Sequence, residues 1–298
     1  MSVRAPAALL LALGACAPAP AADNPPALTA QVEWTNLCSD WDDWDKPALP
    51  FRVKDNTYYV GTCGISAILV TGDEGHVLID SGTEKGAEVV LSNIRELGFD
   101  PRDVKILLHS HEHFDHVGGL ARLQQATGAR LLASAEAAPV LASGETAAND
   151  PQAGMHDPFA GARVDGILTP GEPVRLGNLS LMPVATPGHT RGALSWQWSS
   201  RPGEDGAVPI VYADSLSPVS SDDYRFGDHP EYLQVYRNGL SALAQLDCRI
   251  ILTPHPSASG MRTNIIENGR ISESPSACRD YASSVSERLD VRLAEEAS

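Results

Sequence analysis

Residues 109–119 read "HSHEHFDHVGG", and four histidines and an aspartate fall within the first eight of these positions. Alternate side chains of an extended or turn segment point the same way. A loop of that kind directs His111 and His113 to one metal ion, and Asp115 and His116 to another. Imidazole nitrogen and carboxylate oxygen suit Zn²⁺, and the lack of thiolate in the cluster argues against a purely structural cysteine site. The stretch therefore predicts a zinc site directly after the apolar strand "VKILLHS".

A zinc site needs more ligands than this segment supplies, and two further histidines stand in similar settings. His189 in "ATPGHTRG" and His255 in "ILTPHPS" each follow an apolar strand and lie beside Pro or Gly. Adding them gives three ligands per metal and leaves positions open for water, which is typical of catalytic zinc. The remaining histidines lack such support: His109 is expected to be structural, and the others to be ordinary surface or core residues, namely His76, His156 and His229.

At these residues a family resemblance becomes visible. "HEHFDH" (His111–His116) resembles the HxHxDH motif of the metallo-β-lactamase superfamily, "IDSG" (Ile79–Gly82) resembles its first motif, "PGHT" (Pro187–Thr190) its third, and His255 its fifth. The resemblance spans nearly the whole chain after the N-terminus. It implies an α/β fold, the αββα sandwich, in a single domain with a dizinc site in a groove at one edge. It also implies that Asp80 supports the ligands without binding metal.

The fourth motif separates the classes of this superfamily. Glyoxalase II-like hydrolases, many lactonases and the tRNA-processing nucleases place a bridging aspartate there, and the two commonest lactamase subclasses place a cysteine. This chain reads "VYADSLSPV" (Val211–Val219), which resembles the third lactamase subclass, where serine takes the cysteine's place. The resemblance assigns Ser215 to that position and implies that Ser215 and Ser217 bind the substrate carboxylate. A second registration, with Asp214 as the bridging ligand, stays open at this point.

The resemblance implies a zinc-dependent β-lactamase. Such an enzyme opens the lactam amide of penicillins, cephalosporins and carbapenems with zinc-bound hydroxide and confers antibiotic resistance. Alternatives are a periplasmic lactonase or another dizinc hydrolase of the superfamily, and a non-catalytic exported zinc-binding protein. A monomer acting on a small-molecule β-lactam is expected. Two Zn²⁺ ions per chain are implied, one held by His111, His113 and His189 and the other by Asp115, His116 and His255.

The N-terminus predicts export. "MSVRAPAALLLALGAC" (residues 1–16) has one basic residue followed by an apolar run, and small residues follow it, as in a secretory signal peptide. We predict a signal peptide over residues 1–22 and a mature domain over 23–298 in the periplasm. "LGAC" (Leu13–Cys16) also resembles a bacterial lipobox, so a lipid anchor on the outer membrane stays open. The net charge of −16 argues against a nucleic-acid partner, and no stretch is long enough to predict a transmembrane helix.

The cysteine count fits an oxidising compartment. Of five cysteines, setting Cys16 aside as a lipid anchor or discarded residue leaves four, and an even number in an exported chain indicates disulfides. Three connectivities are possible. We predict the local pairs, Cys38 with Cys63 and Cys248 with Cys278. The resemblance also implies a disulfide near the fifth motif, which fits the second pair.

Apolar periodicity outlines a mixed chain. Helices are expected at 84–98, 119–128, 230–246 and 276–295, with a small helix after residue 134. Two segments lack core periodicity, the long loop 143–162 and the tryptophan-rich stretch Glu33–Asp45. We expect both to border the zinc groove, and we expect shortening of residues 146–153 to change substrate preference without changing zinc content. Strands are expected at 57–62, 65–71, 76–80, 104–110, 130–134, 173–177, 179–186, 193–199, 207–213 and 248–254.

Overall fold

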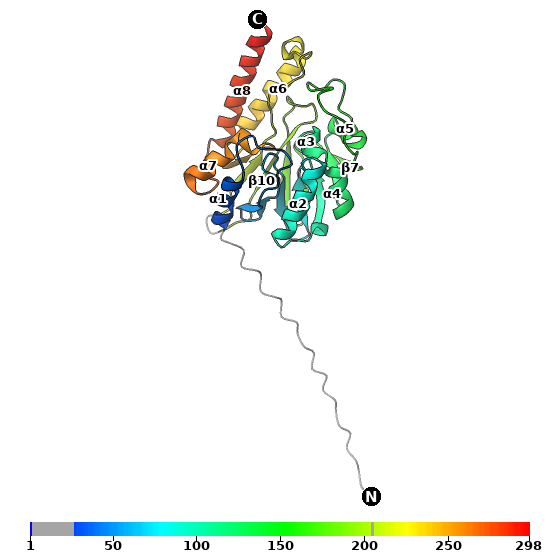
Figure 1. Ribbon diagram of the computed structural model, residues 1–298, viewed down its shortest axis with the longest axis vertical. Coiled ribbons are helices and arrows are strands. Elements are labelled where there is room, and N and C mark those ends of the chain that lie inside the picture. Colours follow the sequence, from blue (N-terminus) through cyan, green and yellow to red (C-terminus); the bar gives the residue numbers. More distant parts are fainter. Residues whose placement is uncertain (2–26, 204–205) are drawn as a thin grey trace.

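The computed structural model describes Met1 and residues 27–203 and 206–298 (Figure 1). The predicted signal peptide, and with it the lipobox ending at Cys16, lies outside the described residues apart from Met1. Within the described part of the chain, no helix combines the length and apolar character needed to cross a membrane.

Two β-sheets form the centre of the fold. In the seven-stranded sheet the strands follow chain order, β1 to β7; the β1–β4 neighbours pair antiparallel, and the β4–β7 neighbours pair parallel. The five-stranded sheet has the order β12-β11-β10-β9-β8, in which only β11 and β12 pair parallel. The strands are β1 Phe51–Lys54, β2 Thr57–Tyr59, β3 Ile68–Thr71, β4 His76–Ile79, β5 Val104–Leu108, β6 Arg130–Ala133, β7 Val164–Ile167, β8 Val174–Leu176, β9 Leu179–Ala185, β10 Leu194–Ser199, β11 Pro209–Tyr212 and β12 Ile250–Leu252.

Helices cover the outer face of each sheet. Figure 1 places α2, α4 and α5 on one side of the molecule, with α6 and α8 adjacent to each other on the other side. The helices are α1 Ala27–Leu37, α2 Glu84–Glu96, α3 Phe114–Val117, α4 Leu120–Thr127, α5 Ala137–Ser143, α6 Pro230–Ala244, α7 Met261–Asn268 and α8 Ala277–Glu296, and short 3-10 turns are η1 Pro101–Asp103, η2 Phe226–Asp228 and η3 Pro256–Ser259.

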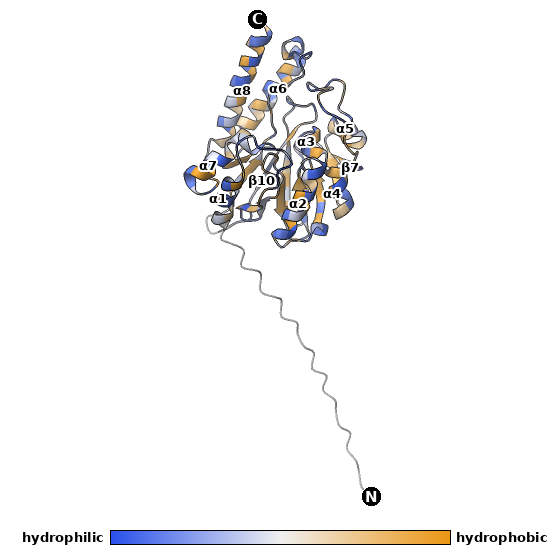
Figure 2. Cartoon of the chain, viewed as in Figure 1, coloured by the Kyte–Doolittle hydropathy of each residue, from blue (hydrophilic) through white to orange (hydrophobic). Residues whose placement is uncertain are grey.

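Three apolar clusters show why these layers form. Successive side chains of a strand point to opposite faces, so Ile68 packs in the cluster between the sheets, whereas Leu69 packs under α2 and α4. A third cluster joins Val211 of β11 to Tyr236 of α6 and Val285 of α8. Apolar residues accordingly colour the strands in Figure 2, whereas the helices carry hydrophilic outer faces. The predicted αββα sandwich is confirmed.

The strand predictions were incomplete at the edges. The structure adds β1 and β7, and it adds α1 and α7, where no helix was expected. The expectation that all of Glu33–Asp45 borders a groove was wrong in part. Trp34 lies on α1, is 1% exposed and packs edge-on against Phe51 and Tyr59 in the core between the sheets.

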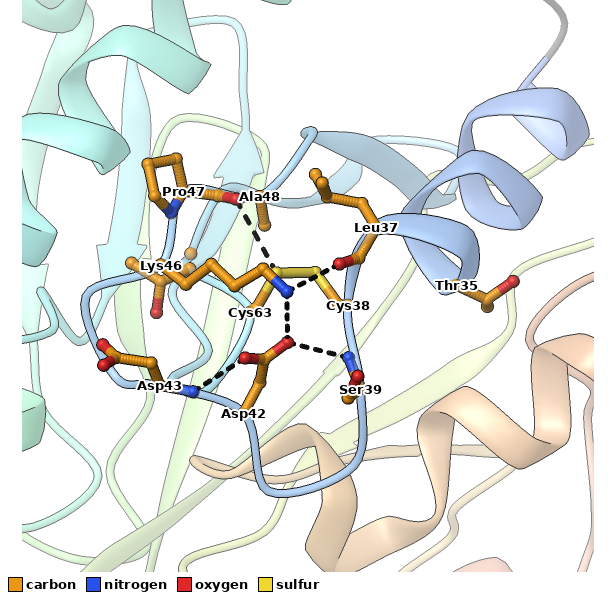
Figure 3. Close-up of a disulfide and its surroundings, with 12 residues drawn as sticks. Thr35, Leu37, Cys38, Ser39, Asp42, Asp43, Lys46, Pro47, Ala48 and Cys63 are labelled. Atoms are coloured by element: carbon orange, nitrogen blue, oxygen red, sulfur yellow. Dashed lines mark hydrogen bonds and ion pairs between the residues drawn. A yellow bond between two sulfur atoms is a disulfide. The ribbon is translucent and has the colours of Figure 1, made fainter.

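The structure pairs Cys38 with Cys63 and Cys248 with Cys278, with Cα–Cα distances of 5.2 Å and 5.9 Å. Figure 3 shows the first pair at the base of the loop that includes Ser39, Asp42 and Lys46. Trp41 and Trp44 belong to the same loop in the sequence. Lys46 donates hydrogen bonds there to the Leu37 carbonyl and to the Asp42 carboxylate, each at 2.8 Å. These are the two local pairs predicted from the sequence, and bond formation in the protein itself stays a prediction.

We expect the double variant Cys38→Ser/Cys63→Ser to lower the free energy of unfolding by roughly 3–4 kcal/mol, because the cross-link restricts a denatured loop of a few tens of residues. Urea titration of the purified protein measures this change. Peptide mapping without reduction checks the pairing itself, and a Cys38–Cys248 peptide would contradict it.

Candidate metal centre

The histidine cluster lies where β5 ends and helix α3 begins. His113 is extended (φ −78°, ψ 147°) and immediately precedes α3, so Asp115 and His116 lie in a helical turn. Of the extended or turn conformations expected from the sequence, His113 thus adopts the extended one, and these two residues lie in the turn. The closing glycine has a steric reason: a Cβ at Gly119 would lie 2.6 Å from the Cβ of Ala87 on α2. Glycine lets the turn approach α2 closely.

A first group of ligand atoms forms around His111, His113 and His189. Their candidate ligand atoms lie within 4.8 Å of one another, and all three side chains are buried. Nδ1 of His113 lies 3.2 Å from Nε2 of His189. The loop after β5 thus meets the loop after β9, about 80 residues further along the chain.

A second group forms beside the first. Candidate ligand atoms of His111, Asp115 and His116 also lie within 4.8 Å of one another. Oδ2 of Asp115 is 3.0 Å from Nε2 of His116 and 3.4 Å from Nε2 of His255, which follows β12. The structure therefore brings together all six side chains that the sequence singled out as ligands, with His111 between the two groups.

The second ring nitrogens of three of these histidines are also held. His113 donates from Nε2 to Oδ1 of Asp150 at 3.1 Å, and His189 donates from Nδ1 to the Ser217 carbonyl at 2.8 Å. Nδ1 of His255 lies 3.3 Å from the Gly64 carbonyl. Such contacts fix the tautomer and ring orientation of a metal-binding histidine.

Asp214 lies behind His111. Its Oδ1 is 2.9 Å from Nδ1 of His111, and its Oδ2 accepts the backbone N–H of Leu216 at 3.0 Å. Asp214 belongs to neither group of convergent ligand atoms. Of the two registrations left open by the sequence, this geometry favours the one that keeps Asp214 out of the metal shell.

Asp80 supports the same histidine through Ser110. Its carboxylate accepts the N–H and the hydroxyl of Ser110 at 2.6 Å and 2.7 Å, and the hydroxyl of Tyr212 at 2.7 Å. The Ser110 hydroxyl in turn lies 3.1 Å from Nδ1 of His111. Burial raises the pKa of Asp80 to about 7, although these hydrogen bonds oppose the rise. Asp80 therefore supports His111 indirectly, through Ser110, as the resemblance implies.

Two buried acids that the sequence analysis did not identify join the loops of the site. Glu112 accepts the hydroxyl of Thr190 at 2.6 Å and the N–H of Gly192 at 2.9 Å, and so links the segments on either side of His189 to the β5 loop. Asp150 reaches His113 from the long loop 143–162. Glu112 stands inside the "HEHFDH" motif, which was a signal for it; no local pattern marks Asp150.

The donor set fits a metal cation. Nε2 of His111 and Nε2 of His116 are buried without a hydrogen-bond partner, which is costly unless another group engages them. Burial lowers the pKa of both imidazoles, well below the ordinary value for His111. For Asp115, burial raises the pKa but His116 and His255 outweigh it, so the pKa falls well below its ordinary range. Neutral imidazoles and an ionised carboxylate are the forms that bind metal.

A cavity of about 320 Å³ opens over these groups. A larger hollow of about 630 Å³ lies elsewhere, around Arg191 and Tyr232, and contains none of the six candidate ligands. The cavity over the metal centre receives side chains from both segments that were expected to border it. Its walls are Trp41, Trp44, His113, Asp115, Gln152, Met155, His156, His189, Ser215, Ser217, Val219, His255, Ala258 and Arg288.

The remaining histidines divide differently from the sequence expectation. His156 was grouped with ordinary residues, yet it lines the cavity, and its ring lies 4.9 Å from that of Phe114. His109 is buried in a structural role, accepting the Ser134 N–H at 3.1 Å. His76 packs against Phe99, and His229 stacks on Tyr224.

Residues 60–201 match the family model described as "Metallo-beta-lactamase superfamily". The solved structure of the MIM-2 metallo-beta-lactamase is 58% identical, covers 90% of this chain and 98% of its own, and superposes with a TM-score of 0.85. This chain belongs to the metallo-β-lactamase superfamily. MEM-A1, a subclass B3 metallo-beta-lactamase from a soil metagenome library, is 39% identical, with coverage of 86% and 99% and a TM-score of 0.80. The family, the hydrolase class and the subclass inferred from the sequence are confirmed.

More distant metallo-β-lactamase superfamily relatives carry other activities in their names. A hydroxyacylglutathione hydrolase of Bradyrhizobium sp. (strain ORS 278) is 27% identical over 161 residues, 52% of this chain and 52% of the relative. The chain thus spans about half the length of that curated relative. Membership of the superfamily therefore does not identify the substrate, which has to be inferred from the site.

Proposed function

We propose that this chain is a zinc-dependent β-lactamase that opens the lactam amide with two Zn²⁺ ions. The observation that carries the proposal is the arrangement at the fourth motif. Asp214 is directed to Nδ1 of His111, and Ser215 lines the cavity in its place. We therefore leave Asp214 out of the proposed metal shell, where glyoxalase II-like hydrolases and many lactonases have a bridging aspartate. The likeness to MIM-2 along nearly its whole length supports the same function.

The proposed ligands are those that the structure brings together. His111, His113 and His189 would hold one ion, and Asp115, His116 and His255 the other. When bound, zinc supplies Lewis acidity and makes a water-derived nucleophile available at neutral pH.

The chain's own residues then position the reactants. Asp115 is ionised and buried beside the centre, so its carboxylate orients the attacking water. Ser215 and Ser217 lie on the cavity wall, and we assign to their hydroxyls the binding of the carboxylate of the drug. Trp41 and Trp44 come from the disulfide-closed loop, and Met155 and His156 from the long loop. These side chains offer apolar and aromatic surface to the variable groups of penicillins, cephalosporins and carbapenems.

Export completes the proposal. A β-lactamase protects a cell by meeting the drug outside the cytoplasm, and the predicted signal peptide over residues 1–22 directs it there. The predicted disulfides belong to the same oxidising compartment. We therefore place the mature enzyme in the periplasm, either free or anchored through Cys16, with antibiotic resistance as its consequence.

We expect the purified protein to hydrolyse nitrocefin. Removal of metal with dipicolinate should reduce the rate about a hundredfold or more, since bound zinc lowers the activation barrier by several kcal/mol. Added Zn²⁺ should restore the rate and Mg²⁺ should not, because imidazole ligands suit zinc. Absorbance of the opened lactam measures both effects, and metal analysis should give two zinc ions per chain.

The same preparation should be assayed with an N-acyl homoserine lactone and with S-lactoylglutathione. Lactam hydrolysis should exceed both by at least tenfold in kcat/KM. Faster turnover of the lactone or thioester would replace the β-lactamase proposal with a lactonase or thioesterase. Zinc binding without any turnover would indicate the non-catalytic protein.

A further inference from the structure

Helix α8 is hydrogen-bonded to the segment that follows β11, and this segment carries the two serines that line the cavity. The hydroxyl of Tyr281 donates to the carbonyl of Ser215 at 2.7 Å. Three turns further along the helix, Nη2 of Arg292 donates to the hydroxyl of Ser220 at 2.8 Å and to the carbonyl of Tyr224 at 3.4 Å. In Figure 1 this helix ends at the C-terminus and runs alongside α6. Both ends of residues 215–220 are thus held against one side of α8.

Arg288 lies on that same side. It is seven residues after Tyr281 and four before Arg292, so at 3.6 residues per turn the three side chains leave the helix within about 40° of one another. Arg288 accordingly lines the cavity together with Ser215, Ser217 and Val219. Its guanidinium also lies beside the hydroxyl of Tyr281: burial raises the pKa of that hydroxyl, and Arg288 opposes the rise.

Arg288 forms no ion pair within the described part of the fold. No carboxylate there lies within ion-pair distance of it, whereas Arg292 on the same face pairs with Glu296 at 2.9 Å. Arg288 is exposed to solvent, and it is the one Lys or Arg among the residues lining this cavity. In a chain of net charge −16, a free guanidinium at the mouth of the metal groove favours an anionic group of the substrate.

We propose that Arg288 binds the ring carboxylate of the β-lactam and that helix α8 is therefore part of the substrate site. This inference rests on the proposed β-lactamase function. Penicillins, cephalosporins and carbapenems share a carboxylate next to the lactam nitrogen, and Ser215 and Ser217 offer it only neutral hydroxyls. Arginine adds charge and a planar pair of N–H donors that matches a carboxylate. Arg288 is in this view a substrate-binding residue that discriminates charged from uncharged β-lactams.

The test compares a penicillin with its methyl ester. We expect Arg288→Met to raise KM for the acid roughly five- to tenfold and to leave kcat within twofold of the parental value. This is the loss expected for a charge-assisted contact that solvent partly screens. Loss of a contact made equally in the ground and transition states changes KM alone. Kinetics on the methyl ester should be the same for the parent and the variant. Arg288→Lys should fall between the two, since it keeps the charge and loses the planar fork.

Arg279→Met is the matched control. Arg279 is an exposed arginine of the same helix, and its nine-residue spacing from Arg288 puts it on the opposite face. It should leave KM for the acid unchanged. Thermal melting of both variants should match the parent, because both side chains are exposed.

The outcomes separate this inference from the proposed function. A parent enzyme that hydrolyses the acid while Arg288→Met keeps the parental KM overturns the role of Arg288 alone. An equal loss on the acid and on the ester also overturns it, because the contact would then be with a group other than the carboxylate. A parent that hydrolyses neither compound overturns both proposals.

Discussion

Replacing any one of the six candidate ligands with alanine is expected to lower nitrocefin turnover about a thousandfold. Loss of a zinc ion should raise the activation barrier by several kcal/mol, and each increase of about 1.4 kcal/mol slows the reaction tenfold. The six positions are His111, His113, His189, Asp115, His116 and His255. The geometry gives this expectation its reason, since each side chain faces another ligand of the cluster, and Nε2 of His111 and Nε2 of His116 are buried without a hydrogen-bond partner.

The position of the missing ligand should decide which ion is lost. His113→Ala and His189→Ala remove donors from the first group, and His255→Ala removes a donor that contacts Asp115. Metal analysis after dialysis should therefore give about one zinc ion per chain for each of these variants. His111 stands in both groups, so its removal should weaken both ions.

His229→Ala is the control for these variants. His229 is exposed and stacks on Tyr224 away from the cluster, so its replacement should leave turnover and zinc content at the parental values. His76 is a poorer control, because it packs against Phe99 in the fold. A variant of any of the six that keeps full turnover and two zinc ions would contradict the assignment of that residue.

The sequence was sufficient to identify the six side chains that the structure brings together, because their chemistry is concentrated in short segments at strand ends. His111, His113, Asp115 and His116 belong to one loop, and only His189 and His255 had to be added from elsewhere. Each of those two follows a strand of the second sheet. The αββα arrangement then brings both sheets' loops to one edge, which is a property of the fold rather than of any local pattern.

The residues that the sequence analysis missed reach the site over long distances in the chain. Asp150 lies 37 residues after the histidine it contacts, and Tyr281 lies 66 residues after its partner, Ser215. Nothing in the local composition distinguishes Asp150 from the other acids of a polar loop. Trp34 was misplaced for the converse reason: it stands near two tryptophans that do line the cavity, but helix α1 directs it into the core.

Asp150 also revises the role of the long loop 143–162. The sequence analysis expected a shortening of residues 146–153 to leave zinc content unchanged. That deletion removes the carboxylate that holds Nε2 of His113. Since the loop supports this candidate zinc ligand, we now expect the deletion to weaken metal binding. A single substitution separates this support from substrate selection.

We expect Asp150→Asn to weaken zinc binding about ten- to a hundredfold, the usual effect of losing the acid that holds a metal-binding histidine. Asp150 is buried, and its Oδ1 accepts both the His113 ring N–H at 3.1 Å and the Gln152 backbone N–H at 2.7 Å. Burial lowers the pKa of His113, but the hydrogen bond and charge of Asp150 outweigh it and raise that pKa. Asp150 thereby makes His113 a more basic ligand and keeps its Nδ1 directed at the metal. An asparagine retains the shape and loses the charge.

Competition with a chromophoric chelator measures the zinc affinity, and nitrocefin turnover at increasing Zn²⁺ measures its consequence. The Asp150→Asn enzyme should be inactive at low zinc and recover most of its kcat at saturating zinc, because all six ligands remain. Asp157→Asn, an exposed acid of the same loop, should behave as the parent in both assays. If Asp150→Asn instead keeps the parental zinc affinity and changes only the relative KM values of penicillins, cephalosporins and carbapenems, the loop acts on the drug alone. The hydrogen bond between Asp150 and His113 would then not contribute to zinc binding.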